Sequence, residues 1–75
     1  MHIKLRLMGS LRDRMPSGNE LELPEGTNIR ELLTILDIPE KRVQVISINN
    51  QFEHDRDRCL QANDQVTILP AVVGG

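Results

Sequence analysis

The chain has 75 residues, of which 39% are hydrophobic and 27% charged, and its formal net charge at pH 7 is −2. This length and composition predict one small globular domain, because disordered chains carry fewer hydrophobic residues. A slightly negative chain offers no basic field for nucleic acid or an anionic membrane surface, so we expect neither as a partner, and a protein partner fits better.

The first third of the chain predicts two strands joined by a loop. Residues 2–7 (HIKLRL) alternate polar and apolar side chains, which is the period of a strand with one buried face. Residues 9–18 (GSLRDRMPSG) carry glycine and proline around a charged centre and predict a loop. Residues 19–24 (NELELP) alternate again until Pro24, so we expect a second strand that pairs with the first as in a hairpin.

The next segment changes to a helical period. One apolar stripe is formed by Ile29, Leu32, Leu33 and Leu36. Thr27 and Asn28 are equally good caps for its start, and Asn28 would place Glu31 in a capping-box position. Pro39 is expected to end the helix, since proline disfavours helical geometry in the residue before it.

The second half of the chain predicts three strands. Residues 42–49 (RVQVISIN) are rich in β-branched residues and form the clearest of them. A turn and a short strand near Phe52 follow, and a turn at residues 63–64 leads to a final strand that ends near Leu69 or Pro70. The order is strand, strand, helix, strand, short strand, strand, which indicates an α+β fold with one helix packed on a mixed sheet.

The two periodicities predict one core between helix and sheet. Its expected members are Ile3, Leu5, Leu7, Ile29, Leu32, Leu33, Leu36, Val45, Val66 and Ile68. Because the final strand completes the sheet, residues 71–75 have nothing left to pair with, and we expect them to project as a mobile tail.

Internal catalytic and metal-binding groups are scarce. His2 and His54 have no second histidine or cysteine at metal-ligand spacing, and we interpret both as surface residues. Residues 53–58 (EHDRDR) lack the glycine of a calcium loop and predict a self-paired run of charges. Cys59 is interpreted as a small buried hydrophobe rather than a nucleophile. We therefore expect no enzyme activity, no metal site and no bound cofactor.

The cellular location follows from two features of the sequence. The single cysteine excludes an internal disulfide and is typical of a reducing compartment. The first eight residues lack the apolar run of a secretory signal, and no stretch approaches membrane-spanning length. These features predict a cytoplasmic protein.

The C-terminal residues 71–75 (AVVGG) combine stiff and unhindered positions. Val72 and Val73 favour an extended chain, whereas Gly74 and Gly75 carry no side chain. Such a tip fits a narrow channel, through which a partner enzyme would reach the terminal carboxylate. The alternative is a chance composition, because a two-residue motif is weak when it stands alone.

Four stretches support the first interpretation by their order and spacing: GSLRD at residues 9–13, LPEGTNIRELLTIL at 23–36, SINNQ at 47–51 and LQANDQVTILPAVVGG at 60–75. Together they resemble the ubiquitin-like β-grasp sulfur carriers of the MoaD/ThiS type, which include the small subunit of molybdopterin synthase and the thiamine-pathway carrier. Asn50 and Asn63 replace turn glycines of that family, and asparagine also tolerates the left-handed conformation. The LRD loop favours the molybdopterin type.

The resemblance implies a single β-grasp domain over residues 1–75. It also implies that the Gly75 carboxylate is adenylated by a separate E1-like enzyme that uses ATP, and that a sulfur donor then displaces AMP to leave a thiocarboxylate. Val72, Val73 and Gly74 would thread the channel of the partner, and Met8, Arg12 and Leu69 would dock on it. A large catalytic subunit of the molybdopterin synthase type is a further expected partner, and the free protein is expected to be a monomer.

Two other functions stay open at this point. A ubiquitin-like modifier would use the same activated Gly75 to form an isopeptide bond with a lysine. A β-grasp interaction module would carry an inert tail. The acceptor of the sulfur is also open, whether a molybdopterin precursor, a thiazole, or the product of a tungsten-cofactor or amino-acid pathway.

Overall fold

The computed structural model describes residues 1–71, and predictions for Val72 to Gly75 lie outside them. Short 3₁₀ helices are labelled η. In chain order the elements are β1 (His2–Leu7), η1 (Gly9–Arg14), η2 (Ser17–Asn19), β2 (Glu20–Glu22), α1 (Ile29–Ile35), η3 (Glu40–Arg42), β3 (Val43–Ile48), β4 (Gln51–Glu53) and β5 (Gln65–Pro70).

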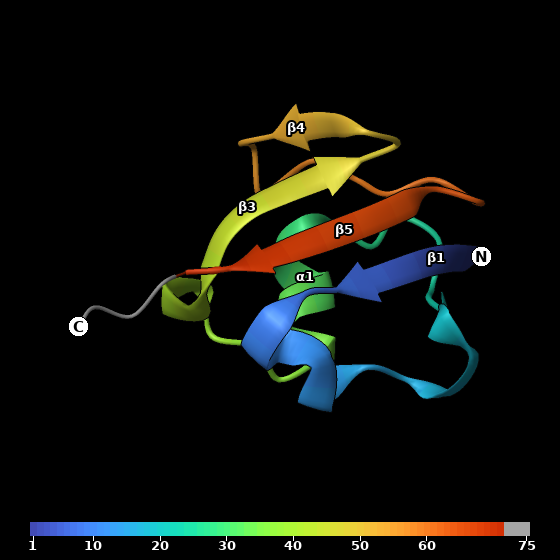
Figure 1. Cartoon of the computed structure of the whole chain (residues 1–75). Coiled ribbons are helices and arrows are strands. Elements are labelled where there is room, and N and C mark those ends of the chain that lie inside the picture. The colour runs from blue at the N-terminus through green and yellow to red at the C-terminus, as the bar shows by residue number, and fades with distance from the viewer. Residues whose placement is uncertain (72–75) are drawn as a thin grey trace.

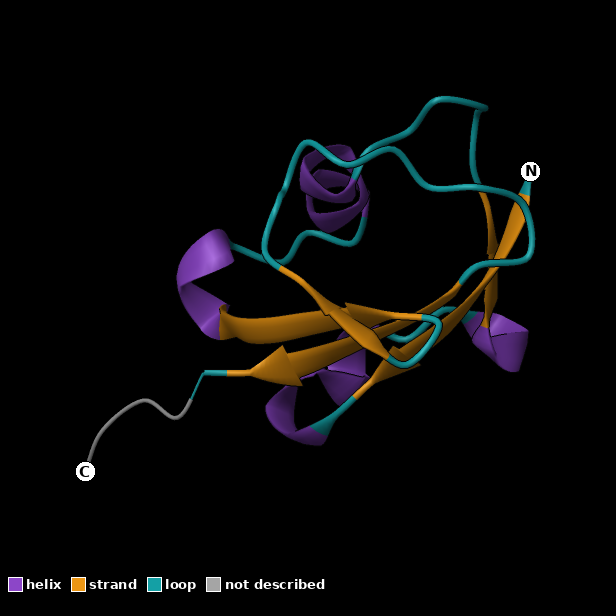
Figure 2. Ribbon diagram, turned by 90° about the horizontal axis from the view of Figure 1, so that it is seen from above, coloured by secondary structure: helices purple, strands orange, loops and turns teal. Residues whose placement is uncertain are grey.

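The strands form one mixed sheet in the order β2-β1-β5-β3-β4. β1 and β5 lie parallel at its centre, and the other neighbouring pairs are antiparallel. α1 lies behind the sheet in Figure 1, and the view from above in Figure 2 shows α1 on one face and η1 on the other. The expected α+β fold, with one helix on a mixed sheet, is confirmed. We call the face away from α1 the open face.

The core lies between α1 and the sheet. Every predicted core residue except Val45 is buried. The register of β3 against β5 shifts between Val43 and Val45, and an extra residue in a strand exchanges its inner and outer positions. Val45 is therefore only half-buried, while Ile46 and Ile48 point into the core. The prediction for Val45 is wrong because strict alternation does not allow for a bulge.

The structure settles how α1 begins and ends. Asn28 is the cap: its side chain accepts a hydrogen bond from Glu31 N at 2.8 Å, and Glu31 Oε1 accepts one from Asn28 N at 3.1 Å. The Thr27 hydroxyl instead donates to the carbonyl of Pro24. The helix stops at Ile35, earlier than Pro39 predicts, because Asp37 adopts a left-handed conformation with φ 57°.

Residues 9–19 are more ordered than the predicted loop. They form η1 and η2, and Leu11 of η1 is fully buried in the core. The core members that the sequence pattern missed are Leu11, Leu23, Ile38, Val43, Ile46, Ile48 and Leu60. Most of them come from positions at the ends of elements or between them, where neither periodicity applies.

The predicted turns are confirmed in their backbone conformation. Asn50 and Asn63 both have φ 69°, the left-handed region that glycine or asparagine tolerates. The two turns are joined through the buried Asp64, whose Oδ1 accepts from Asn49 Nδ2 at 3.0 Å and whose Oδ2 accepts from Gln61 N at 2.8 Å. Within residues 1–71, no helix has the length and apolarity needed to cross a membrane.

Candidate functional site

The described part of the chain ends directly after β5, at the left of Figure 1. We call this point the exit. This is also the end of the sheet where the parallel strand β1 finishes and β3 begins. Ala71 N donates to the carbonyl of Arg42 at 2.8 Å. The expectation that residues from Ala71 onward have nothing to pair with is therefore wrong at Ala71, since backbone pairing continues one residue beyond β5. The predicted functional residues Val72, Val73, Gly74 and Gly75 lie outside the described residues.

A close contact between Gly9 and Pro70 holds η1 against the last residue of β5. Gly9 has φ +55°, and a Cβ at this position would lie 3.0 Å from Pro70 Cγ. Any side chain here would meet both a strained backbone and a rigid ring. Gly9 is thus the residue that lets the loop after β1 approach the chain exit.

Arg42 forms hydrogen bonds both with the exit and with η1. Its carbonyl accepts from Ala71, and its Nη2 donates to the carbonyl of Ser10 at 3.2 Å. We call Gly9, Arg42, Pro70 and Ala71 the exit anchor. Sequence reasoning missed Arg42, because its role depends on the antiparallel pairing of β3 with β5, which is not visible in a local pattern.

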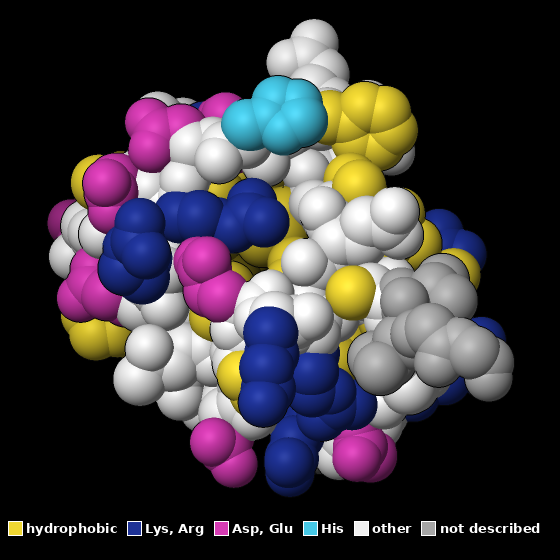
Figure 3. Space-filling view, turned by 90° about the vertical axis from the view of Figure 1, so that its left-hand side faces the viewer, with side chains coloured by type: hydrophobic (Ala, Val, Ile, Leu, Met, Phe, Trp, Pro, Cys, Tyr) yellow, Lys and Arg dark blue, Asp and Glu magenta, His cyan; other side chains and the backbone are white. Residues whose placement is uncertain are grey.

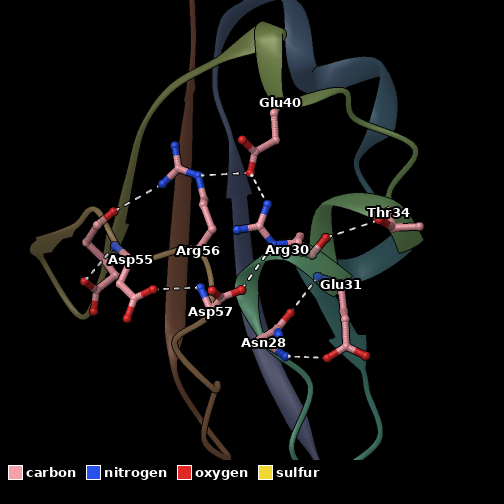
Figure 4. Close-up of polar contacts among 9 residues, drawn as sticks. Asn28, Arg30, Glu31, Thr34, Glu40, Asp55, Arg56 and Asp57 are labelled. Atoms are coloured by element: carbon pink, nitrogen blue, oxygen red, sulfur yellow. Dashed lines mark hydrogen bonds and ion pairs between the residues drawn. The ribbon is translucent and has the colours of Figure 1, made fainter.

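Ion pairs fix η3, the short helix that carries Arg42. Glu40 Oε1 lies 3.7 Å from Arg30 Nη1 of α1 and 3.5 Å from Arg56 Nε, and Arg30 Nε also contacts Asp57 Oδ1 at 3.2 Å. Figure 4 shows Arg30 and Arg56 converging on Glu40, with Asp57 beside Arg30. The exit anchor is therefore connected through η3 to α1 and to the segment between β4 and β5.

Basic residues surround the exit. η1 carries Arg12 and Arg14 in its last turn, and η3 carries Lys41 and Arg42. Figure 3 looks onto this end of the molecule and shows Lys and Arg side chains gathered on it. Acidic side chains lie on the same two helices, Asp13 on η1 and Glu40 on η3, and Figure 3 shows Asp and Glu among the basic side chains of this face.

Two of the three predicted docking residues share a groove of about 620 Å³. Met8 and Arg12 line it together with Lys4, Arg6, Met15 and Glu20. We call it the β1 groove, because it runs along the outer side of β1 beside η1 and η2. Leu69 does not line it. The structure nevertheless places Leu69 near Met8, whose N–H donates to the carbonyl of Ile68.

Leu69, predicted as a docking residue, lies on the open face together with Phe52, which the sequence analysis did not propose for docking. It lies opposite Val45 in the register, and Phe52 of β4 is 73% exposed on the same face. Phe52 pairs with Ser47, which pairs in turn with Thr67 of β5. A signal was present, since Phe52 is the only aromatic residue of the chain and stands in a predicted strand.

The candidate catalytic groups of the sequence remain apart. His2 and His54 are exposed, as interpreted. Arg58 pairs with Glu53 at 3.2 Å within the charged run, whereas the other pairs of that run reach α1 and η3. Among residues 1–71, no three histidine, cysteine or acidic side chains converge as metal ligands.

Cys59 corrects an interpretation. It is exposed rather than buried. Its backbone forms a bridge with Asn28, and the next residue, Leu60, takes the inward position at 3% exposure. The side chain of Cys59 consequently points away from the core.

Comparison with known proteins places these features in context. The model of the ThiS family matches residues 5–75. Among solved structures, SAMP1 from Haloferax volcanii is similar with a TM-score of 0.67 and 14% identity, and each chain is covered to 100%. A chain in the complex of subunits 1 and 2 of molybdopterin-converting factor from Helicobacter pylori 26695 is similar with a TM-score of 0.61 and 23% identity, again with 100% of both chains covered. The search of curated proteins found no match. The expected ubiquitin-like β-grasp fold is confirmed.

Proposed function

This chain belongs to the ThiS family, and we propose that it is a sulfur carrier whose Gly75 is adenylated by a partner enzyme and converted to a thiocarboxylate. The observation that carries the proposal is the extent of the family match, which runs through the Gly-Gly sequence to residue 75.

The proposed chemistry has two steps. A carboxylate is a poor electrophile, so a carboxylate oxygen of Gly75 first attacks the α-phosphorus of ATP and pyrophosphate leaves. Hydrosulfide supplied by a sulfur donor then attacks the acyl carbon of the adenylate, AMP leaves with the electron pair of the broken C–O bond, and loss of the S–H proton gives the thiocarboxylate. The resulting thiocarboxylate holds a nucleophilic sulfur. ATP is bound by the activating enzyme, and this chain itself is proposed to bind no cofactor.

The exit anchor gives the proposal a structural basis. Gly9 and Arg42 hold Pro70 and Ala71 in place, so the point from which residues 72–75 continue is fixed relative to the sheet. We propose that Val72, Val73 and Gly74 pass through a channel of the partner. A fixed starting point reduces the conformational entropy lost when the segment enters such a channel.

The proposed partners are an E1-like adenylating enzyme, a sulfur donor and a large catalytic subunit of the molybdopterin synthase type. The third is supported by the fold shared with a protein whose structure was solved as a complex of two molybdopterin-converting subunits. Met8, Arg12 and Leu69 remain the proposed docking residues, and the exposed Phe52 adds to the apolar surface around Leu69. A monomeric free state and a cytoplasmic location are part of the same proposal.

Intact-mass measurement tests the function directly. With a cognate activating enzyme, ATP and a sulfur donor, the protein should exchange one oxygen for sulfur at Gly75. Deletion of Gly75, or addition of one residue after it, should abolish the exchange. Gly74→Val should block it by bulk at the tip, and His2→Ala, at an exposed site at the start of β1, the end of that strand far from the exit, should react like the wild type.

Two outcomes would contradict the proposal. Exchange of the extended variant at the wild-type rate, with no processing protease present, would show that Gly75 is not the reactive end. Covalent adducts with lysines of other proteins, without accumulation of thiocarboxylate, would show that the chain is a ubiquitin-like modifier instead.

A further inference from the structure

The β1 groove is lined by basic residues without ion-pair partners, whereas most basic residues elsewhere among residues 1–71 have an acceptor. Arg14, Arg30, Arg56 and Arg58 each pair with a carboxylate, and Arg42 donates to a carbonyl. Among residues 1–71, Lys4, Arg6, Arg12 and Lys41 make no ion pair within 4 Å. The first three line the groove, and Lys41 lies outside it. A cationic site thus lies on a chain whose net charge is −2.

The groove also has an apolar component. Met8 and Met15 line it and are half-buried, and methionine adapts its shape to different contacts. It is an open groove with a volume of about 620 Å³, which leaves room for a few side chains of a segment lying along it. Glu20 is the one carboxylate among its lining residues. A ligand that matches these features has carboxylates separated by an apolar side chain.

We propose that the β1 groove binds an acidic, leucine-type segment of a partner protein, and that Lys4 and Arg6 recognise its carboxylates. The inference deepens the proposed function, because the segment would belong to a protein that acts on Gly75. A protein segment fits better than nucleic acid because the groove offers the side chains of Met8 and Met15 to an apolar residue, whereas neither Phe52 nor a histidine lines it to stack on a base.

Binding would begin with long-range attraction. Charges around a site accelerate encounter and set orientation more than they raise affinity, and salt screens them. The groove and the exit lie on connected elements, since η1 supplies both Arg12 and the residues that contact Pro70 and Arg42. A segment bound in the groove would therefore orient the exit toward the enzyme that carries it.

NMR titration of the full-length ¹⁵N-labelled protein tests the groove. The probe is a peptide of sequence EDLEDL, blocked at both ends, and the control peptide is QNLQNL. We expect the acidic peptide to shift the amides around Lys4, Arg6 and Glu20 in a saturable way, and high salt to weaken its binding. Equal shifts with the neutral peptide would overturn the proposal.

Three variants distinguish the groove from general charge attraction. Arg6→Glu should weaken peptide binding about tenfold, because an attraction becomes a repulsion. Glu20→Gln should strengthen it about twofold by removing the repelling carboxylate. Lys41→Glu changes the net charge as much as Arg6→Glu but lies outside the groove, and should change affinity by less than about twofold. Equal losses in Arg6→Glu and Lys41→Glu would show that the groove is not the site.

The same NMR titration is repeated with an oligothymidylate that has the same number of negative charges as the peptide. Weaker binding than the peptide supports the proposal, and tighter binding overturns it in favour of nucleic acid. Peptide binding involves no chemistry at Gly75, so it can fail while thiocarboxylate still forms, or succeed while none forms. The first result would contradict only the proposed binding in the groove, and the second would contradict only the proposed sulfur-carrier function.

Discussion

The two faces of the sheet differ in how many of their side chains are buried or paired within the molecule. On the face covered by α1, Ile46 and Ile68 of the sheet and Leu33 of α1 are 2% exposed or less. On the open face, Phe52 is 73% exposed, and Lys4 and Arg6 have no ion-pair partner among residues 1–71. Substitutions on the covered face should therefore change stability, whereas those on the open face should change binding.

The largest effect is expected at the centre of the covered face. Leu33→Ala removes a buried side chain of α1 and leaves a cavity, which should lower the free energy of unfolding by about 2–5 kcal/mol. Urea denaturation measures it. A loss well below about 1 kcal/mol would mean that α1 does not seal this face.

A matched pair of substitutions compares the faces directly. Ile46→Thr and Phe52→Thr lie on neighbouring strands, β3 and β4, and threonine keeps the preference for strand. Ile46→Thr buries a hydroxyl and should cost about 2 kcal/mol or more. Phe52→Thr should stay within about 0.5 kcal/mol of the wild type, yet weaken binding of the partner enzyme. Similar losses of stability in both variants would contradict the claim that only the covered face contributes strongly to stability.

For the exit anchor we expect a loss of stability between those of the buried and the exposed positions, because it contributes to the fold but lies near the proposed docking surface. Gly9→Ala places a Cβ 3.0 Å from Pro70 Cγ at a left-handed φ, and should cost about 1–2 kcal/mol. Gly26→Ala is the control, because Gly26 also has a positive φ but open space around its Cβ position. A greater loss for Gly9→Ala than for Gly26→Ala in thermal unfolding would isolate the contact with Pro70; equal losses would leave backbone strain as the only cause.

The smallest expected loss of stability on the helical side comes from the cap. Asn28→Ala removes the hydrogen bond to Glu31 N and should cost about 1 kcal/mol. Asn28→Asp, which keeps an acceptor at the cap, should restore most of it. If chemical denaturation gives Asn28→Asp no higher free energy of unfolding than Asn28→Ala, the capping box does not stabilise the start of α1.

Much of the fold follows from sequence periodicity, because alternation in β1 and β5 and the helical stripe of α1 reflect local geometry. The errors arise where distant residues decide. Val45 is misassigned because a bulge changes the register, and Leu11 is missed because η1 is held by contacts with Pro70 and Arg42. Cys59 points outward because its backbone pairs with Asn28.

The candidate site divides in the same way. Met8 and Arg12 follow from resemblance to a family, and the structure brings them into one groove. Arg42 and the cationic partners Lys4 and Arg6 could not be selected from sequence, because nothing local distinguishes a paired surface cation from one that faces a groove. That difference depends on which carboxylates the fold brings near each basic residue.

The parallel pairing of β1 with β5 also constrains how the chain is made. Lys4 lies opposite Gln65 and Leu7 opposite Ile68, so the centre of the sheet joins the first strand described to the last one. On the ribosome, β1, β2 and α1 emerge well before β5, and the edge of β1 that pairs with β5 then has no partner. Folding of this domain should therefore be completed only after β5 has left the exit tunnel.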